Sequence, residues 1–86
     1  MQFVEEVEFS FMPRVEEDAI GGWSAFCDEL QMASCGRTQE DAETNLTATL
    51  QALVRALRRS GILEKTLDEA GLTWKRVETT GVRVVA

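Results

Sequence analysis

The sequence predicts an α+β protein in which one long amphipathic helix packs on an antiparallel sheet, with the elements in β-β-β-α-β order. Apolar residues alternate along the first fifteen positions, short β-prone segments follow between glycine turns, and a helical apolar stripe runs through residues 39–60. A short second helix and one or more C-terminal strands complete the prediction. A chain of 86 residues has room for one domain, which we place at 1–86, with a core at about 3–61 and an extension at 62–86.

Alternation of apolar and polar residues predicts a first strand over residues 3–15, with one face on a core and one in water. Pro13 cannot donate a ladder hydrogen bond, so we expect the strand to be an edge or to bend there. The inward-facing residues of this strand are Phe3, Val7, Phe9, Phe11 and Val15.

Two further strands are expected before the helix. Residues 16–22 form an acidic turn, because Gly21 and Gly22 can adopt positive φ angles without steric cost. A second strand then presents Trp23, Ala25 and Cys27 inward. Residues 28–31 make the next connection, and residues 32–35 a third, weaker strand.

The long helix has clear start and stop signals. Thr38 is a favourable N-cap, and Asp41 three residues later forms a variant of the capping box. Gly61 is the expected left-handed stop, so the helix should span residues 39–60. Its apolar stripe consists of Ala42, Leu46, Leu50, Leu53, Val54 and Leu57.

The spacing of Leu63, Leu67 and Ala70 in the C-terminal extension predicts a short helix that ends at Gly71. Residues 73–78 and 82–85 are β-prone and are joined by a turn at 79–81. The valine-rich last strand is expected to join the main sheet or to pair with a second copy of the chain.

Charge is unevenly distributed along the chain. Residues 1–54 carry a net charge of −9 and residues 55–86 a net charge of +3. An acidic region of this size repels nucleic acid and attracts basic proteins; the alternative is that these acids are solvated faces that keep the protein soluble. The sequence contains no apolar run long enough to span a membrane and no basic leader, so we expect a cytoplasmic protein with reduced cysteines.

Few residue patterns point to catalysis. Histidine is absent, and two cysteines cannot make a zinc site without further ligands. Cys27 and Cys35 are expected to pack as small hydrophobic residues on neighbouring strands. We therefore expect no enzyme activity, no catalytic residue, no cofactor and no metal, although acidic turns could in principle converge on Mg²⁺ as in a nuclease. A basic patch that could contact phosphates, or simply complement the helix dipole, comprises Arg55, Arg58, Arg59, Lys65, Lys75 and Arg76, with Trp74 among them.

Two motifs resemble the core of HicB-type antitoxins. The first is an acidic turn and glycine before an aromatic strand, and the second is a Gly-x-Thr-x-Glu-Glu-Ala pattern that opens a helix, followed by an Asn-Leu pair inside it. The matching residues are Glu17-Asp18-Ala19-Ile20-Gly21-Gly22-Trp23-Ser24-Ala25, then Gly36-Arg37-Thr38-Gln39-Glu40-Asp41-Ala42 and Asn45-Leu46. The likeness covers about residues 7–57. The family's Pro-Asp-Leu-Pro-Gly connection is replaced by residues 27–32, which contain neither proline nor glycine.

The resemblance implies a partial RNase H-like fold and an antitoxin that binds and occludes a small basic ribonuclease of the HicA type. Residues 62–86 do not provide the C-terminal DNA-binding domain of autorepressing members, so direct DNA binding is not expected. A homo-oligomer, dimer or tetramer, is expected. The partner-binding residues would be Glu16, Glu17, Asp18, Asp28 and Glu29, with Trp23 as an apolar anchor or else as a core residue.

The alternatives are a HicB-like adaptor module that self-associates and has no toxin partner, and a weak metal-dependent nuclease.

Overall fold

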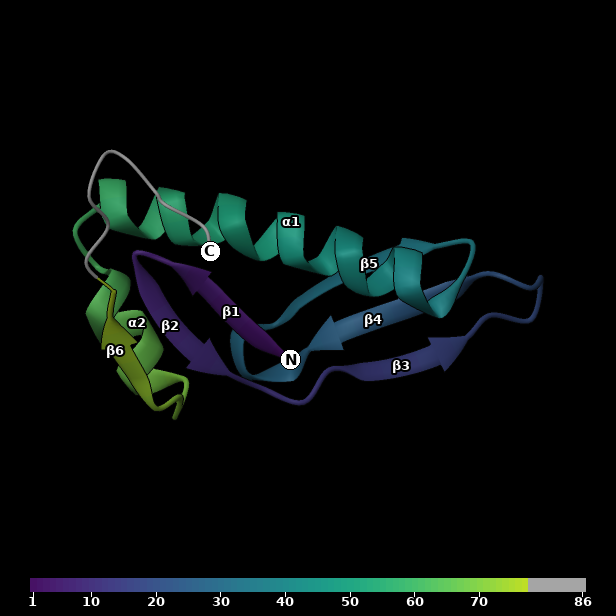
Figure 1. The fold of residues 1–86 in the computed structure, drawn as a ribbon, viewed down its shortest axis with the longest axis horizontal. Helices are drawn as coiled ribbons and strands as arrows, with labels where there is room; N and C mark the ends of the chain where they lie inside the picture. The colour runs from purple at the N-terminus through teal and green to yellow at the C-terminus, as the bar shows by residue number, and fades with distance from the viewer. Residues whose placement is uncertain (78–86) are drawn as a thin grey trace, which may run out of the picture.

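The computed structural model describes residues 1–77, in which five short strands precede the long helix and the strands form two antiparallel sheets (Figure 1). The first sheet has the strand order β1-β2-β6 and the second has the order β3-β4-β5. The predicted α+β class with antiparallel strands is therefore confirmed, but the prediction of one sheet in β-β-β-α-β order is wrong, because the strands divide into two sheets and five of them precede α1. The elements are β1 (Gln2–Glu5), β2 (Val7–Ser10), β3 (Arg14–Glu17), β4 (Trp23–Cys27), the 3₁₀ turn η1 (Asp28–Leu30), β5 (Met32–Gly36), α1 (Gln39–Arg59), α2 (Leu63–Glu69) and β6 (Trp74–Arg76).

The prediction of one continuous first strand is wrong, because residues 2–17 form three strands. Glu6 has a φ of 63° and reverses the chain, so β1 and β2 make a tight hairpin in which Phe3 lies opposite Phe9. In this register odd-numbered residues lie opposite odd-numbered residues. The apolar residues at odd positions therefore all lie on one face of the hairpin, as they would in a single continuous strand. The chain then bends around Pro13 and enters β3, as the proline predicted.

The middle of the chain follows the prediction closely. β4 buries Ala25 and Cys27, and β5 pairs with β4 along its whole length. Helix α1 ends one residue before the predicted end. Thr38 Oγ1 accepts a hydrogen bond of 3.0 Å from the backbone N–H of Asp41, and Gly61 has a φ of 74°. The predicted cap and stop are therefore confirmed.

A single apolar core joins both sheets to α1 and α2. The helix contributes Leu46, Leu50 and Val54, all fully buried, and the first sheet contributes its aromatic face, where Phe3 stacks on Phe9. Leu63 and Leu67 of α2 are also buried, so the predicted second helix is confirmed and the C-terminal segment belongs to the core. Within the segment predicted as a strand at 73–78, residues Trp74–Arg76 form β6, which pairs with β2, and residue 78 lies outside the described residues. The predicted turn at 79–81 and strand at 82–85 lie outside the described residues.

Gly36 explains why the chain can pass so closely from β5 into α1. A Cβ atom at this position would lie 2.6 Å from the backbone nitrogen of Ala42 and 2.7 Å from the Cβ atom of Asp41. Only glycine fits such an approach, which is a structural reason for the glycine of the second motif. The same junction brings the start of α1 next to the β3–β4 hairpin.

Candidate functional site

Helix α1 covers one face of the second sheet, and no other element of residues 1–77 covers the opposite face (Figure 1). Register pairs place Trp23, Ala25 and Cys27 on the covered face together with Val15 and Met32. The opposite face of the same sheet carries the alternate residues of each strand. These are Arg14 and Glu16 of β3, Ser24 and Phe26 of β4, and Ala33 and Cys35 of β5, and we call them the open face.

Arg14 organises the acidic part of the open face. Its Nε and Nη2 atoms donate hydrogen bonds of 3.0 and 3.1 Å to the two carboxylate oxygens of Asp28, and Nη1 contacts Glu16. The guanidinium carbon lies 4.0 Å from the centre of the Phe26 ring. The hydrogen bonds from Arg14 hold the pKa of Asp28 below its usual value. Glu16 and Asp28, two of the predicted partner-binding residues, are thus brought together, but through a cation that the prediction had not included.

The tip of the β3–β4 hairpin is a closed turn with an exposed apolar residue. The backbone N–H of Asp18 donates to the carbonyl of Gly22 at 2.7 Å, and that of Gly21 donates back to the carbonyl of Asp18 at 3.0 Å. Ser24 Oγ lies 3.5 Å from a carboxylate oxygen of Asp18. Ile20, between these residues, is 95% exposed. The turn that joins β3 to β4 extends past the ends of these strands (Figure 1).

The remaining predicted site residues lie elsewhere. Glu17 is opposite Trp23 in the register, so both belong to the face that α1 covers, and Trp23 packs against the core. Glu17 itself is exposed. The carboxylate of Glu29 lies 3.8 Å from Sγ of the buried Cys27. The Glu29 side chain is therefore turned away from the side on which Asp28 binds Arg14. The six predicted residues therefore do not form one continuous patch.

Cys27 and Cys35 lie on neighbouring strands, as expected, but in opposite environments. Cys27 is fully buried, and burial raises the pKa of its thiol. Cys35 is exposed on the open face, so the expectation that both cysteines pack as hydrophobic residues is wrong for Cys35. Strand alternation accounts for the difference, because the register places Cys35 opposite Ser24 and not opposite Cys27.

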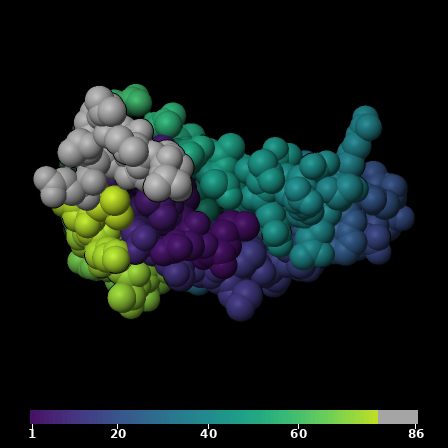
Figure 2. Space-filling view, viewed as in Figure 1, coloured from purple at the N-terminus to yellow at the C-terminus, as the bar shows by residue number. Residues whose placement is uncertain are grey.

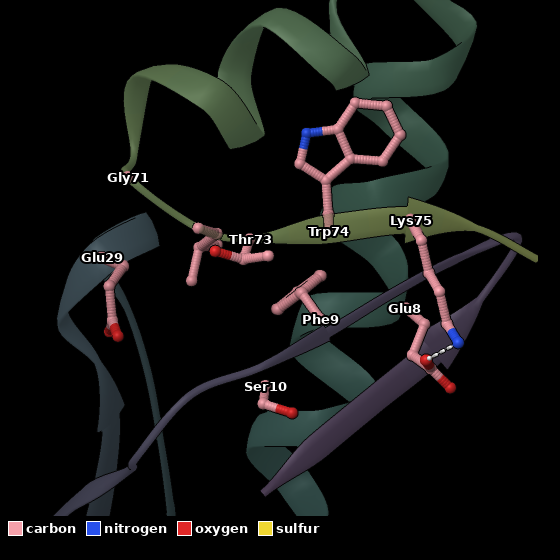
Figure 3. Close-up of a pocket in the computed structure, with 9 residues that line it drawn as sticks. Glu8, Phe9, Ser10, Glu29, Gly71, Thr73, Trp74 and Lys75 are labelled. Atoms are coloured by element: carbon pink, nitrogen blue, oxygen red, sulfur yellow. Dashed lines mark ion pairs between the residues drawn. The ribbon is translucent and has the colours of Figure 1, made fainter.

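A groove of about 460 Å³ separates η1 from β6 (Figure 3). Phe9 and Trp74 line its wall, the ion pair between Glu8 and Lys75 lies at one side, and Glu29 faces it from η1. The indole Nε1 of Trp74 donates a hydrogen bond of 2.7 Å to Asp68 and is already satisfied. Among the described residues that line the groove, the Ser10 hydroxyl makes no hydrogen bond to the carboxylate of Glu8 or Glu29.

Ion pairs neutralise much of the N-terminal acidity. Arg55 binds Glu5 through two hydrogen bonds of 3.0 and 3.1 Å, Arg58 pairs with Glu6, and Lys75 Nζ lies 3.0 Å from Glu8. Three of the six residues of the predicted basic patch thus pair with acids of the β1–β2 hairpin, and Arg76 pairs with Glu64 of α2, whereas Arg59 and Lys65 form no ion pair within residues 1–77. These pairs favour a structural role for most of the patch over phosphate binding.

Eight acids of residues 1–77 have no ion-pair partner. Glu29 lies on η1, Asp68 and Glu69 lie on α2, and Glu43 lies one turn into α1. The other four lie at one end of the molecule. Glu17 and Asp18 of the hairpin, with Glu40 and Asp41 at the start of α1, have no ion-pair partner among residues 1–77. These two segments adjoin, since a Cβ at Gly22 would lie 3.1 Å from Asp18 Oδ2 and 3.5 Å from the carbonyl oxygen of Gly36. In Figure 2 the hairpin (blue) and the start of α1 (teal) form the end of the molecule opposite β6. We call this region the acidic end.

Within residues 1–77, no three acidic or cysteine side chains gather as metal ligands, and no helix has the length and apolar character needed to cross a membrane. Comparison with known proteins found no match to a family model, a curated protein or a solved structure. The likeness to HicB-type antitoxins therefore rests on the motif residues named above.

Proposed function

We propose that this chain is a HicB-like antitoxin-type protein that binds a small basic ribonuclease and covers its RNA-binding surface. The main support is the acidic end, where four exposed acids, Glu17, Asp18, Glu40 and Asp41, adjoin one another without an ion-pair partner among residues 1–77. Opposite charge accelerates encounter with a basic protein and orients it. A surface built to hold RNA phosphates is such a partner.

The two motifs give the proposal its second support, because each has a structural role in the same region. The first motif forms the acidic hairpin turn, and the second permits the close passage into α1 at Gly36 and caps the helix at Thr38. Both motifs therefore shape the acidic end. The partial RNase H-like assignment belongs to this proposal.

Of the six residues predicted to bind a partner, we retain two as the main contacts. Glu17 and Asp18 become the main electrostatic contacts, since Glu16 and Asp28 already bind Arg14 and Glu29 lies on another side. Trp23 packs against the core, which favours the core reading of this residue. Ile20 is the exposed apolar residue of the same turn.

Purification of the tagged chain from its native host tests the proposal. We expect a small basic protein at fixed stoichiometry, whose RNA cleavage stops when the purified chain is added. Glu17→Lys should slow association severalfold at low salt, and this effect should fade as salt is raised. Glu69→Lys is the matched control, because it makes the same charge change on an exposed residue of α2.

Two results would contradict the proposal. One is a chain recovered only with copies of itself, which would favour the self-associating adaptor module. The other is an association rate that responds equally to Glu17→Lys and Glu69→Lys, which would remove the acidic end as the docking region.

A further inference from the structure

We propose that two copies of the chain pair antiparallel through the exposed side of α1, with Asp41 of each copy facing Arg59 of the other. Helix α1 runs along one side of the molecule, and both sheets lie on its other side (Figure 1). The inference goes beyond the proposed function, whose main contacts, Glu17 and Asp18, lie on the β3–β4 hairpin and not on this helix.

The exposed side of α1 carries residues at alternating intervals of four and three positions. This spacing keeps side chains on one side of a helix, and it is the spacing through which two helices pack side by side. On the opposite side, Leu46, Leu50 and Val54 are buried in the core. The exposed residues are Asp41, Asn45, Ala48, Ala52, Arg55 and Arg59, and we call them the outer face of α1.

The outer face is symmetric about its centre, because its successive intervals are four, three, four, three and four. A two-fold axis midway between Ala48 and Ala52 therefore brings each residue opposite a counterpart in an antiparallel second copy. Ala48 then lies opposite Ala52 of the second copy, and these small side chains permit close approach of the two helices. At each end of the pair, Asp41 of one copy lies opposite Arg59 of the other.

The two ends of the outer face carry opposite charges that lack a counterion. Neither Asp41 nor Arg59 forms an ion pair among residues 1–77. Arg55, by contrast, binds Glu5 through hydrogen bonds of 3.0 and 3.1 Å, and Asn45 donates a hydrogen bond to β5. A second copy supplies both missing counterions at once, whereas a uniformly basic partner would oppose Arg59 with like charge.

Charge also selects the orientation and sets the strength of the pairing. A parallel pair would place Asp41 beside Asp41 and Arg59 beside Arg59, which is unfavourable at both ends. The alanines at the centre bury little apolar surface. We therefore expect a weak antiparallel dimer that forms at high protein concentration.

Charge variants test the arrangement, with small-angle X-ray scattering over a concentration series that reaches the millimolar range. The wild type should show a reversible monomer–dimer equilibrium. Asp41→Arg and Arg59→Glu should each weaken the dimer roughly tenfold, because either homodimer would oppose like charges at both ends. Mixing the two variants should restore association, since a mixed dimer regains an opposite-charge pair at each end.

Glu40→Arg is the matched control for Asp41→Arg. Both residues are exposed in the first turn of α1, so both changes oppose the helix dipole, but successive residues point to different sides of a helix. Glu40→Arg should therefore leave the dimer unchanged. Lys65→Glu is the control for Arg59→Glu, because Lys65 is exposed on α2 and forms no ion pair among residues 1–77.

Ala48→Gln tests the same face while every charge stays in place. The longer side chain at the centre should hold the helices apart and weaken the dimer. The thermal stability of the monomer should change little, because Ala48 is exposed and glutamine is a good helix former. This variant also serves should Asp41→Arg fold poorly.

The inference is overturned if the wild type stays monomeric throughout the series, if Glu40→Arg weakens the dimer as much as Asp41→Arg does, or if the mixed variants fail to associate. These outcomes are separate from the proposed function. A ribonuclease partner that binds a strictly monomeric chain would preserve that function and remove this dimer. A dimer that forms through α1 while no ribonuclease partner exists would do the reverse.

Discussion

Asn45 Nδ2, in the second turn of α1, donates a hydrogen bond of 2.7 Å to the carbonyl oxygen of Cys35 in β5. β5 is an edge strand, and edge strands expose backbone groups that can pair with other chains. The asparagine therefore satisfies one edge carbonyl and fastens the helix to the strand. It is also the Asn of the Asn-Leu pair in the resemblance to HicB-type antitoxins.

Asn45→Ala should lower the free energy of unfolding by about 1 kcal/mol, because it removes this hydrogen bond. It should also accelerate amide exchange along β5. Urea denaturation and hydrogen–deuterium exchange measure the two effects. Thr44→Ala is the control, since Thr44 is exposed on the neighbouring helix position. Equal effects of the two variants would show that the bond to Cys35 contributes nothing.

Gly36→Ala should destabilise the protein by about 2 kcal/mol or more, as overpacking does when the neighbouring atoms are backbone. The added Cβ would lie 2.6 Å from the nitrogen of Ala42, and the helix start would have to move. Gly22→Ala is the matched control, because its nearest neighbour is the end of the Asp18 side chain at 3.1 Å, which can rotate away. Thermal unfolding should show a larger loss of stability for Gly36→Ala than for Gly22→Ala, and equal losses would contradict the prediction.

Alkylation should distinguish the two thiols. Cys35 is exposed, whereas Cys27 is fully buried and burial raises its thiol pKa, so less of it is present as the reactive thiolate. Iodoacetamide at pH 8 should therefore modify Cys35 in the folded protein and Cys27 only in denaturant. Mass spectrometry of tryptic peptides locates the label, and equal labelling of both residues under native conditions would refute the prediction.

Asp28 should contribute to stability in a pH-dependent way. Hydrogen bonds from Arg14 lower its pKa in the folded protein below the usual 3.8, so the contribution is fully present above that value. It is lost as the pH falls through the lowered pKa. Wild type should exceed Asp28→Asn in urea midpoint at pH 6, and the gap should close towards pH 2. A constant gap across this range would argue against the pairing with Arg14.

The local elements were predictable from the sequence because their signals are local. Thr38, Gly61 and the apolar stripe of α1 define a helix without reference to the rest of the chain, and the turn glycines delimit β4. The β1–β2 hairpin was not predictable in this way. A reversal at Glu6 leaves the odd-numbered residues on one face, so the alternation is the same for a hairpin as for a single strand.

The candidate site was predictable only in part. The acidic turn could be identified as a charged surface, but the pairing of Glu5 with Arg55 or of Asp28 with Arg14 depends on the tertiary fold. The sequence did hold a signal for the contact between Arg14 and Glu16, since residues two apart on a strand share a face. The position of Phe26 on the same face depends on the register of β3 with β4, which cannot be predicted from the sequence.

The pairing of β2 with β6 places Val7 beside Arg76, near the end of the described chain. Residues 11–73 separate β2 from β6, so the N-terminal hairpin is synthesised well before the strand that pairs with its edge. Until β6 has been made, the edge of β2 lacks this partner, and unpaired apolar strands are prone to aggregate. Charged residues at Glu5, Glu6 and Glu8, which later engage Arg55, Arg58 and Lys75, would keep the nascent hairpin hydrated during that interval.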